Sequence, residues 1–328
     1  MKNLLPVIFL LITLSSNAQK QAPVKIIFDT DIAPDYDDVG AMALLHAFAD
    51  MGEAEILATI SCNAFETTAP TLSLLNNYFN RPGIPIGITK KQLPNKDCAQ
   101  QWAQAIIAKY PPPMRSNTDA VEAVKLYRKI LSDQSDKSVT IVSVGFFTNL
   151  AGLLTSTADE FSALDGTALV TKKVKHLVSM AAGIGKDEKS AYEFNVLIDA
   201  PASQKVFKDW PTPVIMSGFE IGEKILTGIR LIKNTSIQNS PVKDAYEVAL
   251  TKDKNTTGRN SWDQTAVLVA VRGIAPWFGY RKLNFEVKDD GKNILIPGEK
   301  FTYLTFKQTP EEIGKFIEDL MMHQPVKK

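Results

Sequence analysis

The chain has 328 residues, of which 45% are hydrophobic and 22% are charged, and its 37 basic side chains nearly balance its 36 acidic ones. This composition is globular and argues against a disordered, collagen-like or disulfide-dense protein. The balanced charge provides no long-range field for nucleic acid or for an anionic membrane, so we expect a small-molecule partner.

The N-terminus has the pattern of a secretory signal peptide. Lys2 precedes an apolar run over residues 4–14, and small residues follow at Ser16 and Ala18, at the spacing that signal peptidase accepts. The apolar run is too short to span a bilayer. We therefore predict a cleaved signal peptide over residues 1–18 and a secreted or periplasmic protein.

Short β-branched or aliphatic runs alternate with helical patterns along the rest of the chain, residues 19–328, which we interpret as one domain. The predicted strands are residues 24–30, 56–61, 84–87, 139–144, 175–180 and 214–216. The predicted helices include residues 39–49, 68–79, 99–109, 120–132, 200–208 and 263–271. A later stretch, residues 285–306, favours antiparallel strands at one edge. The alternation predicts an α/β fold with an open, mainly parallel (mixed) sheet and helices on both faces.

Cysteine and histidine are too sparse to build a zinc site. Cys62 and Cys98 could form one disulfide or remain two free, buried thiols, and the histidines are His46, His176 and His323. No cluster of these residue types exists in the sequence, so any metal would have oxygen ligands.

Aspartates crowd the loop after the first predicted strand, where ligands of open α/β sheets bind. Five carboxylates fall within ten residues, at Asp29, Asp31, Asp35, Asp37 and Asp38. Carboxylates this close raise one another's pKa unless a cation or hydrogen-bond donors compensate, and Ca²⁺ or Mg²⁺ prefers such oxygen ligands. A purely structural acidic turn is the alternative, because aspartates at a helix N-terminus cap its free N–H groups.

Two familiar aspartate-rich patterns do not fit this loop. An EF-hand requires a central glycine and a glutamate at its twelfth position, and neither is correctly placed here. A haloacid-dehalogenase-type phosphatase would share the Asp29-x-Asp31 pair, but Ala33 stands where such enzymes carry Thr or Val, and the Asp37-Asp38 pair has no counterpart.

The aspartate loop and four later blocks together resemble the inosine-uridine-preferring nucleoside hydrolases, a family of nucleoside N-ribohydrolases. The later blocks are Ser61-Cys62-Asn63, Gly145-Phe146-Phe147-Thr148-Asn149-Leu150, Met180 followed by Glu193-Phe194-Asn195 and Asp199, and Ser261-Trp262-Asp263. The resemblance implies a Rossmann-like nucleoside hydrolase fold, an N-glycosyl hydrolase that releases a free base and ribose from nucleosides, and a homodimer or homotetramer.

The resemblance also implies a set of site residues. A Ca²⁺ ion would be held by Asp31, Asp38, the carbonyl of Thr148 and Asp263, and Asp31 would act as general base toward a water molecule that the metal acidifies. The residues implied to bind the sugar are Asp37, Asn63, Glu193 and Asn195, with Met180 packing beside it. The plainer alternatives are a capped surface loop for Glu193 and Asn195 and a core position for Met180.

Two departures from the family pattern are visible in the sequence. Asp31 and Asp37 stand six positions apart rather than four, so the loop is two residues longer and Asp35 competes for the register. We choose Asp37 and Asp38, because they form the adjacent pair that precedes a helix. The loop over residues 183–190 also lacks the family's asparagine, and Asp187 there is either its substitute or part of a solvated turn.

The third departure is Trp262, which stands where many members carry a histidine near the leaving base. Indole is not a useful proton donor, so activation of the leaving group must differ. Trp262 with Phe219 or Tyr192 could stack on a base, which favours purines; a partly buried core aromatic is the alternative. Two other functions stay open, namely hydrolysis of another N-riboside, such as a nicotinamide or modified-base riboside, and a non-catalytic secreted ribose- or nucleoside-binding protein.

Overall fold

The computed structural model describes residues 22–325, so the predicted signal peptide lies outside the described residues. One large sheet has the strand order β11-β12-β8-β6-β5-β1-β2-β3-β4, with β7 added beside β12, and β9 and β10 form a separate pair. The strands are β1 (Val24–Thr30), β2 (Ala54–Ser61), β3 (Ile86–Ile88), β4 (Val121–Glu122), β5 (Val139–Ser143), β6 (Val174–Met180), β7 (Ser190–Ala191), β8 (Val214–Ser217), β9 (Leu226–Thr227), β10 (Arg259–Asn260), β11 (Phe278–Val287) and β12 (Asn293–Phe306).

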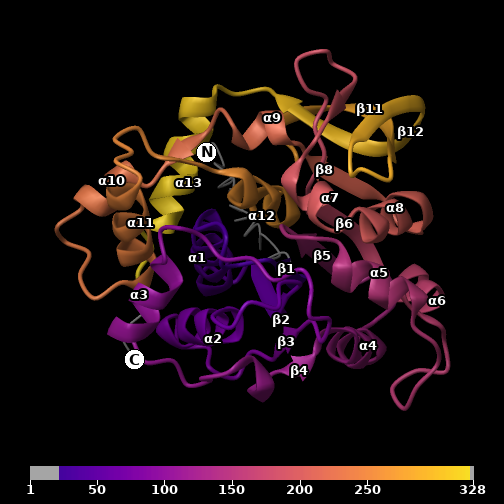
Figure 1. The fold of residues 1–328 in the computed structure, drawn as a ribbon, viewed down its shortest axis with the longest axis horizontal. Coiled ribbons are helices and arrows are strands. Elements are labelled where there is room, and N and C mark those ends of the chain that lie inside the picture. The colour runs from indigo at the N-terminus through magenta and orange to yellow at the C-terminus, as the bar shows by residue number, and fades with distance from the viewer. Residues whose placement is uncertain (1–21, 326–328) are drawn as a thin grey trace, which may run out of the picture.

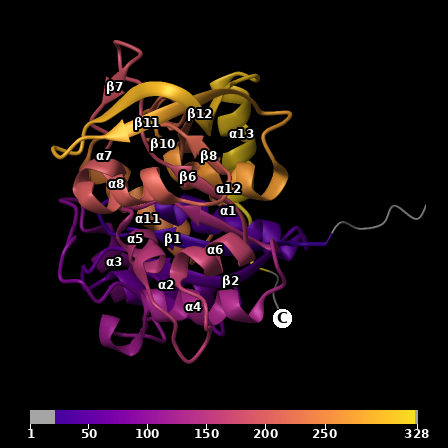
Figure 2. The same ribbon diagram turned by 90° about the vertical axis from the view of Figure 1, so that its right-hand side faces the viewer.

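The sheet is mainly parallel, as predicted. Strands β4, β3, β2, β1, β5, β6, β8 and β12 pair in parallel, whereas β11 and β7 run antiparallel to β12. In Figure 2 the long β11 and β12 lie at the top, far from α2 and α4. The predicted antiparallel edge is therefore confirmed.

Helices cover both faces of the sheet because its central strands are apolar on both sides. In β1, Ile26 and Phe28 pack into one hydrophobic cluster and Ile27 packs into the other. The first cluster is covered by α1 (Asp37–Asp50), α2 (Thr68–Tyr78), α3 (Trp102–Lys109), α11 (Pro241–Lys252), α12 (Trp262–Arg272) and α13 (Pro310–Met321). The second is covered by α4 (Ala123–Asp133), α5 (Thr148–Thr155), α6 (Gly166–Lys173) and α8 (Ala200–Asp209), on the right in Figure 1. The remaining short helices are α7 (Phe194–Ile198), α9 (Phe219–Gly222), α10 (Ile229–Lys233) and one 3₁₀ turn, η1 (Asn117–Asp119).

The predicted element boundaries differ from the observed ones by a few residues. The largest shifts at helix starts are three residues each, in α3, predicted from residue 99 and observed from Trp102, and in α4, predicted from residue 120 and observed from Ala123. In α4 the Glu122 side chain accepts hydrogen bonds from the backbone N–H groups of Val124 and Lys125 and so caps the helix. The third strand was expected at residues 84–87 and spans Ile86–Ile88.

Both cysteines are free, so of the two possibilities in the sequence the structure has the unbridged one. Cys62 is buried and donates a weak hydrogen bond to the carbonyl of Thr30, 3.3 Å away. Among residues 22–325, no helix has the length and apolar character needed to cross a membrane.

Candidate active site

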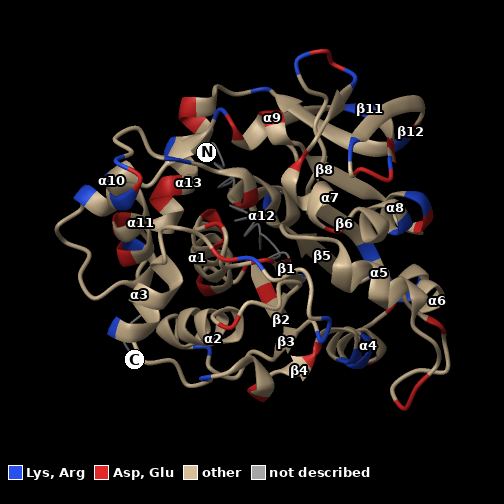
Figure 3. Cartoon of the chain, in the orientation of Figure 1, with Lys and Arg blue, Asp and Glu red and all other residues tan. Residues whose placement is uncertain are grey.

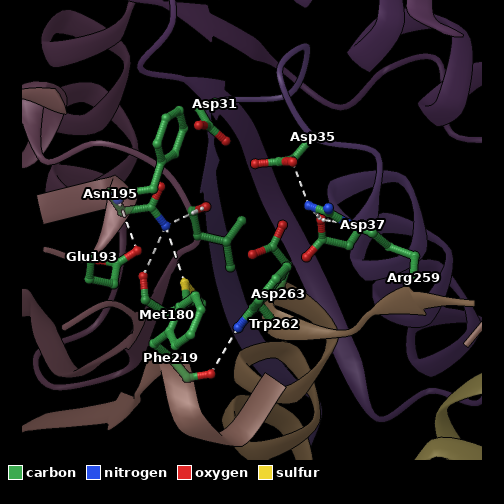
Figure 4. A pocket seen from close by; sticks show the side chains of 12 residues that line it. Asp31, Asp35, Asp37, Met180, Glu193, Asn195, Phe219, Arg259, Trp262 and Asp263 are labelled. Atoms are coloured by element: carbon green, nitrogen blue, oxygen red, sulfur yellow. Dashed lines mark hydrogen bonds and ion pairs between the residues drawn. The ribbon is translucent and has the colours of Figure 1, made fainter. Parts of the chain in front are cut away.

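A pocket lies at the carboxyl edge of the sheet, where the ends of β1, β5 and β6 meet the starts of α1, α7 and α12. It is a cavity of about 190 Å³. Its walls are formed by Asp31, Asp35, Asp37, Val144, Met180, Glu193, Phe194, Asn195, Phe219, Arg259, Trp262 and Asp263. Figure 4 shows that these side chains come from segments far apart in the sequence and converge on one space. The parallel strands explain this, because their carboxyl ends share one edge.

The lengthened aspartate loop runs directly into α1. The helix begins at Asp37, and both Asp37 and Asp38 are buried, in agreement with the choice of this pair from the sequence. The Thr30 hydroxyl donates to Asp38 and its oxygen accepts the backbone N–H of Ile32, which ties the loop to the end of β1.

Three buried acids form a group that can hold a metal ion. One carboxylate oxygen from each of Asp37, Asp38 and Asp263 lies within 4.8 Å of the others. Figure 3 shows acidic segments gathered beside α1 and β1 in the middle of the molecule. Asp31 lines the same pocket, and Oδ2 of Asp31 and Oδ2 of Asp38 are buried without a hydrogen-bond partner.

Electrostatics agrees with a cation at this point. Burial, followed by the charges of neighbouring aspartates, raises the pKa of Asp31, of Asp38 and of Asp263 well above the ordinary value. A divalent cation removes that penalty by supplying the missing positive charge and accepting the orphaned oxygens as ligands. An all-oxygen donor set suits a hard ion rather than zinc or copper. The residues present therefore fit the metal that the sequence predicted.

Asp29, the first aspartate of the series, has a structural role and does not line the pocket. Asp29 is buried and accepts hydrogen bonds from the Tyr127 hydroxyl at 2.8 Å and from the Asn149 amide at 3.1 Å. Burial raises the pKa of Asp29 to about 7. Beside Asn149, Thr148 begins α5 and donates its hydroxyl to Asp199 at 2.5 Å. These bonds fix the backbone around Thr148, whose carbonyl stays a predicted metal ligand.

The wall opposite the aspartates is built by Glu193, Asn195 and Met180. The Glu193 carboxylate is the N-cap of α7: it accepts the N–H groups of Asn195 and Val196, and also that of Ala182. Burial raises the pKa of Glu193 to about 7. The Asn195 amide donates to the carbonyl of Met180 at 3.1 Å. Glu193 therefore both caps α7 and lines the pocket. Glu193 and Asn195 together make this wall of the pocket polar.

Asn63 and Asp187 do not line the pocket. The Asn63 amide donates to the carbonyls of Asp31 and Lys96, at 2.9 and 2.8 Å, and its oxygen accepts the N–H of Lys96. Asn63 thus fixes the backbone of the aspartate loop. Asp187 accepts the N–H groups of Lys189 and Ser190, which makes it part of a solvated turn, the second of the two sequence interpretations.

Aromatic side chains form the outer part of the pocket. The rings of Trp262 and Phe219 lie 5.3 Å apart between centroids, and the indole N–H of Trp262 donates to the Phe219 carbonyl at 2.9 Å. Phe194 also lines the pocket and is 40% exposed. Tyr192 does not: its hydroxyl donates to Asp290 on the surface. Of the two partners considered for Trp262, the structure therefore brings Phe219 to it.

Sequence reasoning missed Arg259, the one basic side chain that lines the pocket among residues 22–325. It comes from β10 and donates to Asp37 through Nε at 3.0 Å and through Nη2 at 2.7 Å. The pKa of Asp37 is raised by burial, and the charge of Arg259 opposes that rise. The signal in the sequence was a basic residue three positions before Trp262, but nothing in the sequence indicated that this residue lies beside the aspartate loop.

Comparison with known proteins agrees with this architecture. The family model described as inosine-uridine preferring nucleoside hydrolase matches residues 26–312. The chain belongs to this family. A nucleoside hydrolase of that description from Leishmania major is 25% identical over 72% of this chain and 76% of its own length. A pyrimidine-specific ribonucleoside hydrolase from a Shewanella strain is 30% identical over 60% of this chain and 59% of its own length.

Solved structures support the fold independently. A purine-preferring ribonucleoside hydrolase from Gardnerella vaginalis superposes with a TM-score of 0.66 at 17% identity, covering 91% of this chain and 99% of that one. This nucleoside hydrolase is thus an N-glycosyl hydrolase of a metal-dependent family, with an acidic cluster where a metal can bind.

Proposed function

We propose that the protein hydrolyses the N-glycosidic bond of ribonucleosides in a Ca²⁺-dependent reaction, with a preference for purines. The observation that carries the proposal is the buried acidic group of Asp37, Asp38 and Asp263, with orphaned oxygens on Asp31 and Asp38, at the base of the family's pocket. Burying such a group of carboxylates without a cation costs free energy, and their oxygen atoms are the ligands that a hard cation prefers.

The chemistry follows from the placement of these acids. Asp31, Asp38, the Thr148 carbonyl and Asp263 would hold the Ca²⁺ ion, which would supply the charge that makes a water molecule more acidic. Asp31 takes a proton from the attacking water molecule as the water oxygen forms a bond to the anomeric carbon of the ribose. The bond between this carbon and the base nitrogen breaks, its electron pair leaves with the base, and the base takes a proton from solvent.

The sugar and the base have separate walls. Asp37, Glu193 and Asn195 receive the ribose hydroxyls, Met180 packs beside the sugar, and Asn63 keeps the Asp31 backbone in place. Trp262 and Phe219 offer ring faces to the base. No histidine is among the described residues that line this pocket, so binding of the base by stacking takes the place of a histidine beside the leaving group, and larger purine rings gain more from stacking.

We also propose export of the protein. Cleavage after Ala18 would leave residues 19–328 as a single-domain enzyme outside the cytoplasm, assembled as a homodimer or homotetramer, with nucleoside catabolism as its role. N-terminal sequencing of the mature protein and its mass in solution test these points. An uncleaved N-terminus would contradict the secretory prediction.

The reaction is tested by base release from purine, pyrimidine and nicotinamide ribosides, with Ca²⁺ and after chelation. We expect release that is fastest from purine ribosides and is lost on chelation. Asp31→Asn should lower kcat by about 10²- to 10⁴-fold, the usual contribution of a general base, while substrate binding persists.

Two results would redirect the proposal. Faster release from nicotinamide riboside would move the substrate class to other N-ribosides. Tight nucleoside binding without release, equal in wild type and Asp31→Asn, would favour the non-catalytic binding protein.

A further inference from the structure

Arg259 and Asp35 form a pair that the proposed reaction does not use. Arg259 donates to both Asp35 and Asp37, so one guanidinium bridges two carboxylates of the lengthened loop. Figure 4 shows Arg259 beside Asp37 and Asp35 on one side of the pocket, opposite Asn195. Arg259 reaches the loop from β10, which lies 222 residues further along the chain than Asp37.

The bridge is held rigidly on several sides. The central carbon of the guanidinium lies 5.0 Å from the ring centroid of Tyr36 and 5.0 Å from that of Trp262. Only 19% of the Arg259 side chain and 2% of the Asp37 side chain are exposed. A shielded guanidinium that stacks on aromatic rings and makes two bonds to one acid has little freedom to move.

The bonds from Arg259 leave part of Asp37 available. Both end on Oδ1, so neither occupies Oδ2, and Asp37 lines the pocket. Asp35 lies in the segment that makes this loop two residues longer than the family pattern. The Asp35 carboxylate contacts Nη2 of Arg259 and so anchors the guanidinium that holds Asp37. This contact is a structural role for the longer loop.

We propose that Arg259, anchored by Asp35, is a positioning residue that turns Oδ2 of Asp37 toward a ribose hydroxyl and so makes the enzyme select ribonucleosides over deoxyribonucleosides. The inference rests on the proposed function, since it assigns Asp37 to the sugar. A carboxylate fixed on one oxygen can offer the other in a single direction, and a site built to bond a hydroxyl rejects the analogue that lacks it.

The experiment compares kcat/KM for inosine with that for 2′-deoxyinosine and 3′-deoxyinosine, in wild type and in Arg259→Gln, Arg259→Lys and Asp35→Asn. In Arg259→Gln the preference for inosine over one of the two deoxy analogues should shrink by about 10- to 100-fold, the worth of a hydrogen bond to a charged group. Activity on that same analogue should change little. Arg259→Lys should fail to restore the preference, because an ammonium cannot reproduce the two-bond fork.

Arg272 provides a matched control. It also makes two bonds to one acid, Glu53, and stacks on Phe48 and Phe316, but it lies outside this pocket. Arg272→Gln should keep the wild-type preference. Ca²⁺ affinity, measured by calorimetry, should be unchanged in Arg259→Gln.

Failure of the inference is distinguishable from failure of the proposed function. If Arg259→Gln loses activity on inosine and both analogues equally, or loses Ca²⁺ affinity, the positioning role is overturned while nucleoside hydrolysis stands. If the wild type releases no base, the proposed hydrolase function is wrong. The hydrogen bond between Asp37 and a ribose hydroxyl is then tested by calorimetry, which compares binding of D-ribose with binding of 2-deoxy-D-ribose and 3-deoxy-D-ribose. Equal discrimination by wild type and Arg259→Gln there overturns the inference as well.

Discussion

Trp262 is the residue whose replacement best separates base recognition from chemistry. Its ring contacts Phe219 and Arg259, and its N–H is bonded to a backbone carbonyl, so its orientation is fixed within the pocket. A fixed ring face can bind a base by stacking, but it cannot pass a proton to it.

We predict that Trp262→Ala raises KM for purine ribosides by about 10-fold, the lower end of what loss of base stacking costs, and that Trp262→Phe raises it less. The effect should fall mainly on KM. Tyr192→Ala is the matched control, because Tyr192 is an exposed aromatic near the pocket that does not line it. An equal effect of both substitutions on KM would contradict stacking by Trp262.

Among individual residues, most of those in the family blocks reach the pocket, although Asn63 does not, and the residue contributed by a distant short strand was missed. Asp31, Asp37, Met180, Glu193, Asn195, Trp262 and Asp263 all line the pocket, and the resemblance to the family had implied these residues. Arg259 was missed because it lies in a two-residue strand that pairs with Thr227. A strand of two residues is too short to show a hydrophobic periodicity. Only the folded chain therefore reveals that Arg259 lies beside Asp37.

At the scale of elements, the site depends on how closely the segment after β5 approaches the loop after β1. A Cβ atom added at Gly145 would lie 2.5 Å from the backbone N of Asp31, 2.7 Å from Sγ of Cys62 and 2.8 Å from the backbone C of Thr30. Backbone atoms of a central strand cannot yield easily, so only glycine fits.

We predict that Gly145→Ala lowers the free energy of unfolding by about 1–3 kcal/mol, the usual cost of overpacking, and lowers kcat because it displaces Asp31. Urea denaturation and base release measure the two effects. Gly83→Ala is the control, since a Cβ there meets nothing within 4 Å. If Gly145→Ala kept wild-type stability and turnover, the segment after β5 and the loop after β1 would not be packed as closely as described, and the prediction would be wrong.

The elements show the same division between local and distant information. Strands β1 and β6 were predicted almost to the residue because continuous apolar runs mark buried parallel strands. Helices α11 and α13 were not among the named predictions, although α13 begins with a capping box of Thr309 and Glu312 around Pro310. The start of α13 could therefore have been predicted from adjacent residues, whereas the pairing of β9 with β10 joins segments far apart in the sequence and could not.

At the scale of the whole molecule, the acids of the pocket link the stability of the fold to pH. Burial and mutual repulsion raise the pKa of Asp31, of Asp38 and of Asp263, and burial raises that of Glu193 to about 7. A raised pKa means that the folded state binds more protons than the unfolded state. The stability that these groups contribute is present in full below their unfolded pKa and is lost as the pH rises through the folded pKa.

Under the proposed function, bound calcium would reverse this dependence, because a cation binds the deprotonated carboxylates and competes with protons. We predict that the rise in melting temperature caused by excess Ca²⁺, relative to the chelated protein, is large at about pH 8 and small at about pH 5. His46 and His176, whose pKa burial lowers to about 3 and about 4, act in the opposite direction, but they do so in both forms. The difference between the two melting temperatures therefore isolates the acids of the pocket. An equal shift at both pH values would mean that calcium does not bind this acidic group.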